Sequence, residues 1–475
     1  MSDSKPIVSR TGKTEFIRMV RYKSENQIGV LAQFLTTIAQ EGGSIGDVKT
    51  RKLGKFYIWR DVTIIANDRE HFAQILKAIR TLKQTKVEQI IDEVLERHQG
   101  GKIKMELNTR IETVNDMRAV YTPGVADVCR LIQKDPDEAY NYTWIHQTVA
   151  LLTNGSRTLG LGNVGPVAAM PVMEGKAALF KKFTGYNMIP IPINTTDPQE
   201  FIDTALRISP GFGAIHLEDI SAPECFEIEA ALVKNLNIPV MHDDQDGTAV
   251  VCLAAVINAC RIVKGDLAKV QIGQVGLGAA GSAIARLIMA YTKRNVWCCD
   301  KNPAAVDRLE EFRQNSATLE EIMERCDVVI STTGVERLIN PSMVKPQQII
   351  LALTNPVPEI TEEQALSAGA AFYSDGRYVN NLLAYPGIFK GALETRATGI
   401  NDSMLLAAVQ AIVDATPQGE IVPSPLDPGV HSAVTKAVAK AAMTSGLAQK
   451  DLDDEYFELE EKTQEAHPAL KRSFV

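Results

Sequence analysis

Acidic side chains gather at two places where a short apolar segment ends. Asp243, Asp244 and Asp246 form one group, and Glu218 and Asp219 form the other. The segment before each group is typical of a buried strand. If these strands are neighbours, at least three carboxylates converge on one point, and their burial is costly without compensation. Because the set is all oxygen, a hard cation such as Mg²⁺ or Mn²⁺ suits it better than Zn²⁺.

Some residues in and near these groups have simpler roles. Asp246 stands before Gly247, Thr248 and an apolar helical stretch, so we expect it to cap that helix. His216 and His242 lie close to the carboxylates in the sequence. A hard cation with enough oxygen ligands does not need them, and we interpret both as residues of the core or of the ligands' surroundings.

Two cationic side chains stand in unusual surroundings. Arg157 is the only charge in a glycine-rich segment, where we expect a short strand. It suits a bidentate clamp on a substrate carboxylate, although a surface arginine at a strand edge is the simpler interpretation. Lys176 follows Gly175, where we expect an apolar helix to begin. Near a metal and apolar walls its pKa would fall far enough for a general base, whereas a solvated lysine is the commoner case.

Residues 270–287 carry a strong signal for dinucleotide binding. An apolar strand is followed by Gly276, Gly278 and Gly281 in the G-x-G-x-x-G spacing, and then by a helix. A second strand ends at Asp300, 19 residues after Gly281. These glycines let the backbone approach a pyrophosphate at the helix N-terminus, and Asp300 suits the ribose hydroxyls. The aspartate favours NAD, although the adjacent Lys301 is compatible with NADP.

The first 98 residues predict a small α+β unit of the ferredoxin-like kind. Two amphipathic helices alternate with strand patterns in the order β-α-β-β-α-β, with strands near 16–22, 45–51, 55–66 and 87–91. The turn before the first helix, with Asn26 and Gly29, resembles that of the ACT regulatory domains. The resemblance implies a small regulatory ligand at this turn. A dimerisation module without a ligand is an equally good interpretation.

The remainder of the chain predicts α/β layers with mostly parallel sheets. From Leu107 onward, short apolar strands alternate with helical patterns. The strands within 327–334 and 349–356 end in small polar residues, as expected where parallel strands face a ligand. We expect three domains: residues 1–98, a substrate and metal domain at 99–246, and a Rossmann-like dinucleotide-binding domain with a C-terminal helical extension at 247–475.

Composition excludes several classes of partner. The chain has 475 residues and a formal net charge of −8 without a long basic block, which argues against nucleic acid and membrane surfaces. No apolar run reaches the roughly 18 residues of a membrane helix, and the first residues lack the apolar stretch of a signal peptide. The seven cysteines lack paired metal-ligand spacing and are expected to be buried and reduced. We therefore expect a cytoplasmic protein with a small substrate.

Five separated motifs together resemble the malic enzymes. They are Y-T-P-G-V at 121–125, S-R-T-L-G-L-G-N at 156–163, E-G-K-A-A-L-F at 174–180, L-E-D-I at 217–220 and H-D-D-Q-D-G-T-A at 242–249. L-T-N-P at 353–356 and V-N-N-L-L-A-Y-P-G at 379–387 extend the match. The order and combination of these motifs are very specific, and they indicate the compact bacterial kind of the family.

The resemblance implies a role for each candidate residue. Lys176 would be the general base, Tyr121 the general acid, and Asp243 would support the proton transfer. The divalent metal would be held by Glu218, Asp219 and Asp244. Malate would be contacted by Arg157, Asn355 and Asn381. The cofactor would be contacted by Thr248, Gly276, Gly278, Gly281, Asp300 and Asn355.

The implied activity is the metal-dependent oxidative decarboxylation of L-malate to pyruvate and CO₂, with reduction of NAD. The motifs are equally compatible with a malolactic enzyme, which keeps NAD bound and releases lactate. Two further alternatives stay open: an amino-acid dehydrogenase, which has no need of the metal carboxylates, and a catalytically silent sensor. We expect a homodimer or a higher homo-oligomer.

Overall fold

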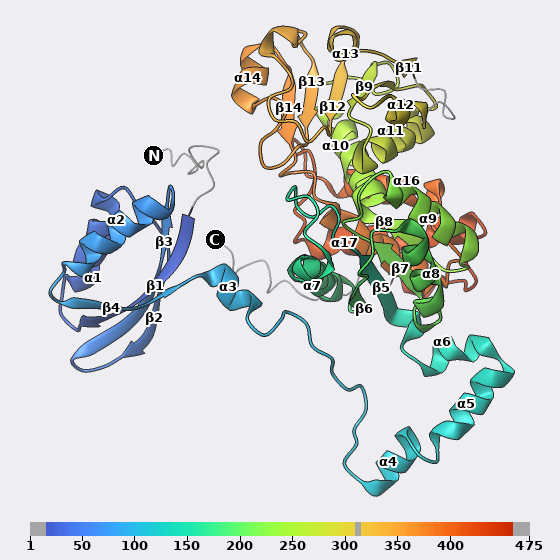
Figure 1. The fold of residues 1–475 in the computed structure, drawn as a ribbon, viewed down its shortest axis with the longest axis horizontal. Helices are drawn as coiled ribbons and strands as arrows, with labels where there is room; N and C mark the ends of the chain where they lie inside the picture. The colour runs from blue at the N-terminus through green and yellow to red at the C-terminus, as the bar shows by residue number, and fades with distance from the viewer. Residues whose placement is uncertain (1–15, 309–314, 459–475) are drawn as a thin grey trace. The chain divides into compact units, whose positions relative to one another are not determined.

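The computed structural model describes residues 16–308 and 315–458 of the chain (Figure 1). The chain divides into two compact units, Met1–Lys104 and Met105–Val475. Each unit has a hydrophobic core of its own. The second unit carries all the candidate catalytic, metal-binding and cofactor-binding residues.

The first unit is a four-stranded antiparallel sheet with two helices packed on it. Its elements are β1 (Phe16–Glu25), α1 (Val30–Gln40), β2 (Ser44–Leu53), β3 (Tyr57–Ala66), α2 (Arg69–Arg80) and β4 (Thr85–Ile91), followed by α3 (Glu93–His98). The strand order β2-β3-β1-β4 is ferredoxin-like. Phe34 and Ile38 of α1 and Ile75 of α2 pack on Val20 and Val62 of the sheet. The predicted order of elements is therefore confirmed.

The second unit begins its globular part with a four-stranded parallel sheet. The strands β5 (Thr148–Thr153), β6 (Asn187–Pro192), β7 (Ala214–Leu217) and β8 (Val240–His242) lie in the order β6-β5-β7-β8. They alternate with α7 (Pro166–Thr184), α8 (Pro198–Ile208) and α9 (Glu224–Asn235). Since β7 and β8 are adjacent and Leu217 pairs with His242, the acidic residues after both strands emerge side by side.

A six-stranded parallel sheet forms the second layered part of this unit. Its strands are β9 (Ile272–Val275), β10 (Trp297–Cys299), β11 (Asn315–Ser316), β12 (Val328–Ser331), β13 (Ile349–Ala352) and β14 (Phe372–Asp375). The helices between them are α11 (Ala279–Thr292), α12 (Pro303–Asp307), α13 (Leu319–Arg325) and α14 (Glu362–Ser367). The order β11-β10-β9-β12-β13-β14 is that of a doubly wound dinucleotide-binding sheet.

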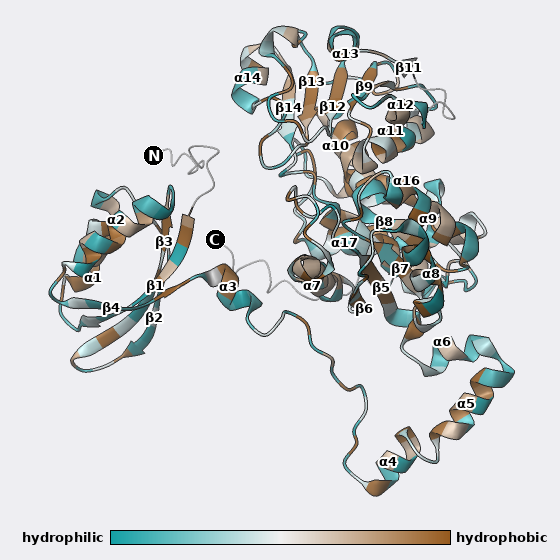
Figure 2. Ribbon diagram, in the orientation of Figure 1, coloured by the Kyte–Doolittle hydropathy of each residue, from teal (hydrophilic) through white to brown (hydrophobic). Residues whose placement is uncertain are grey.

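Four further helices pack around the two sheets. They are α10 (Thr248–Ile262), α15 (Tyr385–Glu394), α16 (Asp402–Ala415) and α17 (Pro428–Thr444). Helix α10 is buried along most of its length, packs on α11 and α16, and is coloured as hydrophobic in Figure 2 together with the central strands. Helix α15 contacts α7 and α17. Over the described ranges, every helix is too short or too polar to cross a bilayer.

An arm of three short helices precedes β5. Its elements are α4 (Val114–Val120), α5 (Val125–Lys134) and α6 (Ala139–Tyr142). Helices α4 and α5 bury none of their residues, and Figure 1 shows them extending away from both sheets of this unit. Val114, Met117, Val120 and Leu131 are left exposed on them. The arm therefore carries apolar side chains that the described part of the chain does not cover.

Candidate active site

The two acidic groups meet at the carboxyl ends of β7 and β8, as predicted. Single carboxylate oxygens of Glu218, Asp219 and Asp244 lie within 4.8 Å of one another. Among the described residues, the Oδ2 atom of Asp219 is buried and has no hydrogen-bond partner. The backbone of Asp219 has a φ of 55°, which is strained for a residue other than glycine. Converging carboxylates with a buried oxygen that lacks a partner fit an all-oxygen cation site.

Crowding and burial disfavour the charged forms of these carboxylates. Burial, assisted by the charges of Glu218 and Asp244, raises the pKa of Asp219 to about 8. Burial also raises the pKa of Glu218 to about 7, although the nearby Lys176 acts in the opposite direction. Both shifts are the expected result of carboxylates that converge without enough positive charge. A divalent cation would remove the cause of the repulsion.

Lys176 lies at the centre of this cluster. Its Nζ is 2.5 Å from Glu218 Oε1 and 2.5 Å from Asp243 Oδ2, and its side chain is 9% exposed. Burial lowers the pKa of Lys176, but the charges of Asp243 and Glu218 together outweigh burial and hold it well above its ordinary value. The prediction of a lowered pKa is therefore wrong for these side chains by themselves, because it did not foresee two carboxylates in direct contact.

The helix that carries Lys176 also differs from the prediction. Helix α7 begins at Pro166, after Gly165 with a φ of 77°, and Lys176 lies well inside it. The sequence predicts that an apolar helix begins near Lys176, but Gly175 and Lys176 are interior residues of α7. Proline at the first helical position, here Pro166, is a common signal for the start of a helix. The prediction placed the start near Gly175 instead.

Asp243 is fully buried and supports the cluster from behind. It ion-pairs with Lys176 and accepts a long hydrogen bond of 3.4 Å from the Thr248 hydroxyl to its backbone oxygen. His216 Nε2 contacts Glu218 Oε2 at 2.8 Å, and burial lowers the pKa of His216 to about 3. Both histidines are fully buried, as expected of core residues. His216 also lies within 4.8 Å of carboxylate oxygens of Glu218 and Asp243, so its role beside the ligands stays a prediction.

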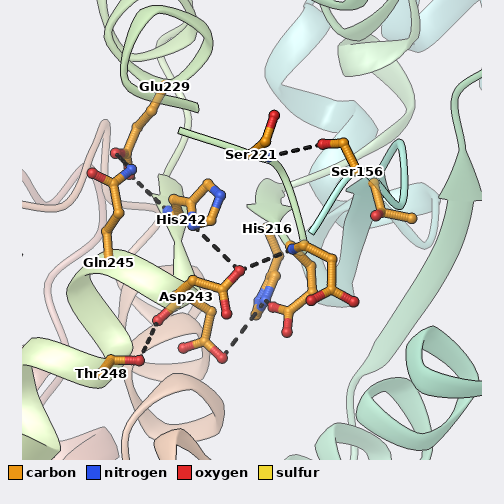
Figure 3. Close-up of polar contacts among 12 residues, drawn as sticks. Ser156, His216, Ser221, Glu229, His242, Asp243, Gln245 and Thr248 are labelled. Carbon is orange, nitrogen blue, oxygen red and sulfur yellow. Dashed lines mark hydrogen bonds and ion pairs between the residues drawn. The ribbon is translucent and has the colours of Figure 1, made fainter. Parts of the chain in front are cut away.

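A half-buried carboxylate holds the backbone of the acidic turn, as Figure 3 shows. Glu229 of α9 accepts hydrogen bonds from the backbone N–H of His242 at 2.7 Å and from Gln245 Nε2 at 2.6 Å. On the opposite side of the cluster, the backbone N–H of Ser221 donates to Ser156 Oγ at 2.8 Å. These contacts fix the segments that carry Asp243 and Asp219 relative to their neighbours.

Asp246 does not cap the following helix. Residues Asp243–Gly247 form a π-helical turn that runs directly into α10, and α10 has no side-chain cap. The Oδ1 atom of Asp246 instead accepts from Arg286 Nη2 of α11 at 2.6 Å, and Arg286 also pairs with Asp402 of α16. The capping prediction is wrong because an arginine 40 residues away competes for the carboxylate.

A cavity of about 1100 Å³ connects the acidic cluster with the dinucleotide turn. It lies between loops of the four-stranded and the six-stranded sheet. Eleven of the predicted site residues line it: Arg157, Lys176, Glu218, Asp219, Asp244, Thr248, Gly276, Gly278, Asp300, Asn355 and Asn381. Most of the site residues predicted from the sequence therefore line one cavity.

Arg157 reaches the cavity from a loop rather than from a strand. Residues 154–165 form turns and irregular backbone, so the expected short strand is absent from this described segment. The backbone N–H of Arg157 donates to Asp219 O at 3.0 Å. Its Nη2 lies 3.5 Å from where a Cβ on Gly334 would stand, so the guanidinium faces the loop after β12.

The dinucleotide turn has the geometry that its glycines predict. Gly276 has a φ of 89°, and a Cβ on Gly281 would lie 1.9 Å from Gly276 O. Gly281 therefore lets helix and strand pack closely and does not line the cavity. Asp300 Oδ2 accepts from Leu277 N at 2.7 Å, which places the carboxylate at the cavity wall beside the turn.

Tyr121 lies apart from the cavity. It caps the C-terminus of α4, its side chain is 71% exposed, and it is not among the lining residues. The Y-T-P-G-V motif identified Tyr121 as a candidate residue. No pattern in the sequence indicates that the arm which carries Tyr121 extends away from the cavity.

Several lining residues were not singled out from the sequence. Thr332 and Thr333 follow β12, and Ser221 and Val172 lie near the carboxylates. The polar end of the strand within 327–334 indicated ligand contact for the two threonines without identifying which residue makes it. Five of the seven cysteines are buried as expected, whereas Cys129 is exposed and Cys299 is half-buried, and all seven are free.

Comparisons with known proteins agree with this geometry. Residues 100–233 match the family model "Malic enzyme, N-terminal domain". The chain is 51% identical to NAD-dependent malic enzyme 1 of Bacillus subtilis, over 90% of this chain and 98% of that protein. It is 41% identical to a bifunctional malic/malolactic enzyme of the same organism, over 78% and 97%. The crystal structure of a malic enzyme from Pyrococcus horikoshii superposes with a TM-score of 0.72 at 37% identity, covering 78% of this chain and 94% of that one. The chain therefore belongs to the malic enzyme family.

Proposed function

We propose that this protein oxidises and decarboxylates L-malate to pyruvate and CO₂, with reduction of NAD and with Mg²⁺ or Mn²⁺ as the metal. The observation that carries the proposal is Lys176 between Glu218 and Asp243, in one cavity with the dinucleotide turn. Such a cavity brings a proton acceptor, a cation site and a hydride acceptor to one substrate.

Positive and polar side chains account for the binding of malate. Arg157 suits a bidentate contact with one carboxylate, and Asn355 and Asn381 line the same cavity as amide donors. Lys176 takes the proton of the C2 hydroxyl while hydride leaves C2 for the nicotinamide, and a 2-keto acid results. CO₂ then departs, and Tyr121 protonates the enolate at C3.

Three carboxylates fit the divalent metal: Glu218, Asp219 and Asp244. The fit rests on the all-oxygen donor set and on the orphaned Oδ2 atom of Asp219. A bound cation would supply Lewis-acid stabilisation of the negative charge that develops on the substrate oxygen. Its charge would also compensate Glu218, one of the groups that raise the pKa of Lys176.

Asp244→Asn tests the metal site without turnover. We expect the variant to bind Mn²⁺ at least about tenfold more weakly, because one anionic ligand is lost. Isothermal titration calorimetry measures this, with Asp203→Asn on α8 as the control, since Asp203 is a half-exposed carboxylate away from the cavity. Equal Mn²⁺ affinity of Asp244→Asn and the wild type would remove Asp244 from the ligand set.

Asp300→Ala tests cofactor selectivity. A carboxylate at this place accepts hydrogen bonds from the adenosine ribose and repels a 2′-phosphate. We expect the ratio of kcat/KM for NAD over NADP to fall about tenfold or more, since hydrogen bonds to a charged group are lost. Asp307→Ala on the adjacent α12 is the control, because Asp307 is exposed and outside the cavity. An unchanged ratio in Asp300→Ala would contradict the assignment.

The exposed position of Tyr121 is best explained by a homodimer. The arm that carries Tyr121 presents Met117 and Val120, and the cavity loop exposes Leu159 and Leu161, at 71% and 75%. Two apolar surfaces that one chain leaves open can cover each other between two chains. Tyr121 then enters the cavity of a second copy and completes its set of proton-transfer groups.

Residues 1–98 are proposed to be an ACT-like regulatory module. Gly29, with a φ of 89°, opens α1, and Asn26 Nδ2 donates to Gly54 O at 3.0 Å, as in a fixed turn beside a small ligand. Residues 99–246 would serve substrate and metal, and 247–475 the cofactor. The absence of a bilayer-crossing helix from the described ranges is consistent with the cytoplasm.

The malolactic alternative is less favoured, because the bifunctional relative is less similar than the NAD-dependent one. Absorbance of reduced nicotinamide, with L-malate, NAD and Mn²⁺, tests the proposal when pyruvate and lactate are assayed together. We expect NADH and pyruvate in equal amounts, and no turnover with a chelator. Lactate without net NADH would overturn the oxidative reaction, and turnover that resists the chelator would overturn the metal.

A further inference from the structure

A buried carboxylate that the proposed function does not use lies beneath the cavity wall. Glu359 follows β13 and precedes α14, and it is 0% exposed. It does not line the cavity. An isolated buried carboxylate costs free energy, so the hydrogen-bond partners of Glu359 indicate its role.

Glu359 joins two loops through its side chain. Its Oε1 accepts from Thr333 N at 2.8 Å, from Thr333 Oγ1 at 2.9 Å and from Thr354 Oγ1 at 2.5 Å. Its Oε2 accepts from Thr354 N at 3.3 Å. The Thr354 hydroxyl in turn accepts from Gly334 N at 2.9 Å. One side chain thus fixes the backbone of the loop after β12 to that of the loop after β13.

These two loops form the wall of the cavity that is opposite the adenosine side. Thr333 and Asn355 both line the cavity, and Gly334 faces Arg157. Strands β12 and β13 lie on the other side of β9 from β10, whose end carries Asp300. A dinucleotide that places its adenosine ribose at Asp300 therefore extends its nicotinamide half across β12 and β13.

We propose that Glu359 is a positioning residue for the nicotinamide half of the cofactor and for malate. By binding both loops, it sets the distance between Thr333 and Asn355 across the cavity wall. This inference rests on the proposed function for the identity of the ligands. Turnover falls strongly when the reacting groups are displaced even slightly from their productive positions. Glu359 therefore affects catalysis indirectly, through the two loops that its side chain fixes.

Glu359→Gln tests this role with two ligands, NADH and ADP-ribose, of which only NADH contains nicotinamide. Glutamine has nearly the same shape, but its NH₂ group opposes donors of Thr333 or Thr354 instead of accepting from them. We expect the Kd of NADH, measured by nicotinamide fluorescence, to rise about tenfold, and kcat/KM for malate to fall about 10- to 100-fold. The affinity for ADP-ribose, which lacks nicotinamide, should stay within about twofold of the wild type.

Two companion variants keep the test decisive. Glu363→Gln on α14 is the control, because Glu363 is exposed and outside the network. Thr354→Val removes the hydroxyl that joins Glu359 to Gly334 and leaves the carboxylate in place, so it should show the same selective loss even if Glu359→Gln does not fold. Equal weakening of NADH and ADP-ribose would overturn the positioning role and leave a structural one, as would no weakening of either. Because both ligands bind without malate, failure of the wild type to oxidise malate would count against the proposed function alone.

Discussion

Replacement of Lys176 by alanine is expected to lower kcat for malate oxidation by about 100- to 10,000-fold, the usual contribution of general acid–base catalysis. The side chain is almost fully buried and is the group nearest to both Glu218 and Asp243. In the proposed reaction it is also the proton acceptor. NADH binding should be nearly unchanged, because the dinucleotide turn lies at the other end of the cavity. Stopped assays of pyruvate and fluorescence titration with NADH measure the two effects.

Two further variants separate the loss of a base from the loss of a charge. In Lys176→Ala the buried carboxylates lose the ammonium group that pairs with them. Breaking a buried ion pair in this way costs about 3–5 kcal/mol of stability. Lys176→Arg keeps the positive charge but cannot give up its proton, so it should fold stably and still be inactive. Lys182→Ala, on the exposed side of the same helix, should retain wild-type activity. Substantial turnover by folded Lys176→Arg would exclude Lys176 as the base.

Tyr121→Phe is expected to lose activity about as strongly, and the loss should be repaired between chains. In a heterodimer of Tyr121→Phe and Lys176→Ala chains, one cavity receives an intact lysine from its own chain and an intact tyrosine from the other. That heterodimer, purified through two different tags, should have roughly half the wild-type activity, because the second cavity lacks both groups. If Tyr121 acted within its own chain, the heterodimer would be inactive.

The reciprocal heterodimer gives the opposite result and serves as the control. It pairs a wild-type chain with a chain that carries both Tyr121→Phe and Lys176→Ala. With tyrosine shared between chains, neither cavity has both groups, and activity should be absent. About half of the wild-type activity in this heterodimer would show that Tyr121 returns to its own cavity, and it would contradict the shared site.

Local sequence patterns predicted much of the fold and the cofactor-binding part of the site. Gly276 and Gly278 predicted their turn correctly because a tight turn below a helix N-terminus restricts the residue type at each position. The convergence of Asp219 and Asp244 also followed from the sequence, since both groups end buried strands and parallel strands end at the same edge. Periods and turn residues encode features of this kind within a few positions.

Features that depend on partners distant in the chain were not predictable in the same way. The sequence predicts that Asp246 caps a helix, but in the fold its carboxylate forms an ion pair with Arg286. The pKa of Lys176 depends on two carboxylates whose contact is set by sheet order and not by spacing in the sequence. Tyr121 is exposed because the arm does not pack on the described residues near the cavity, and hydrophobic periodicity in the sequence does not predict such an exposure.

The transfer of hydride from C2 of malate to the nicotinamide is the central claim, and isotope labelling tests it most directly. L-Malate deuterated at C2 is turned over with NAD and Mn²⁺, and the products are analysed by NMR. The proposed reaction predicts deuterium at C4 of the reduced nicotinamide in free NADH and none in pyruvate. Deuterium recovered at C2 of lactate, with no labelled NADH released, would contradict it.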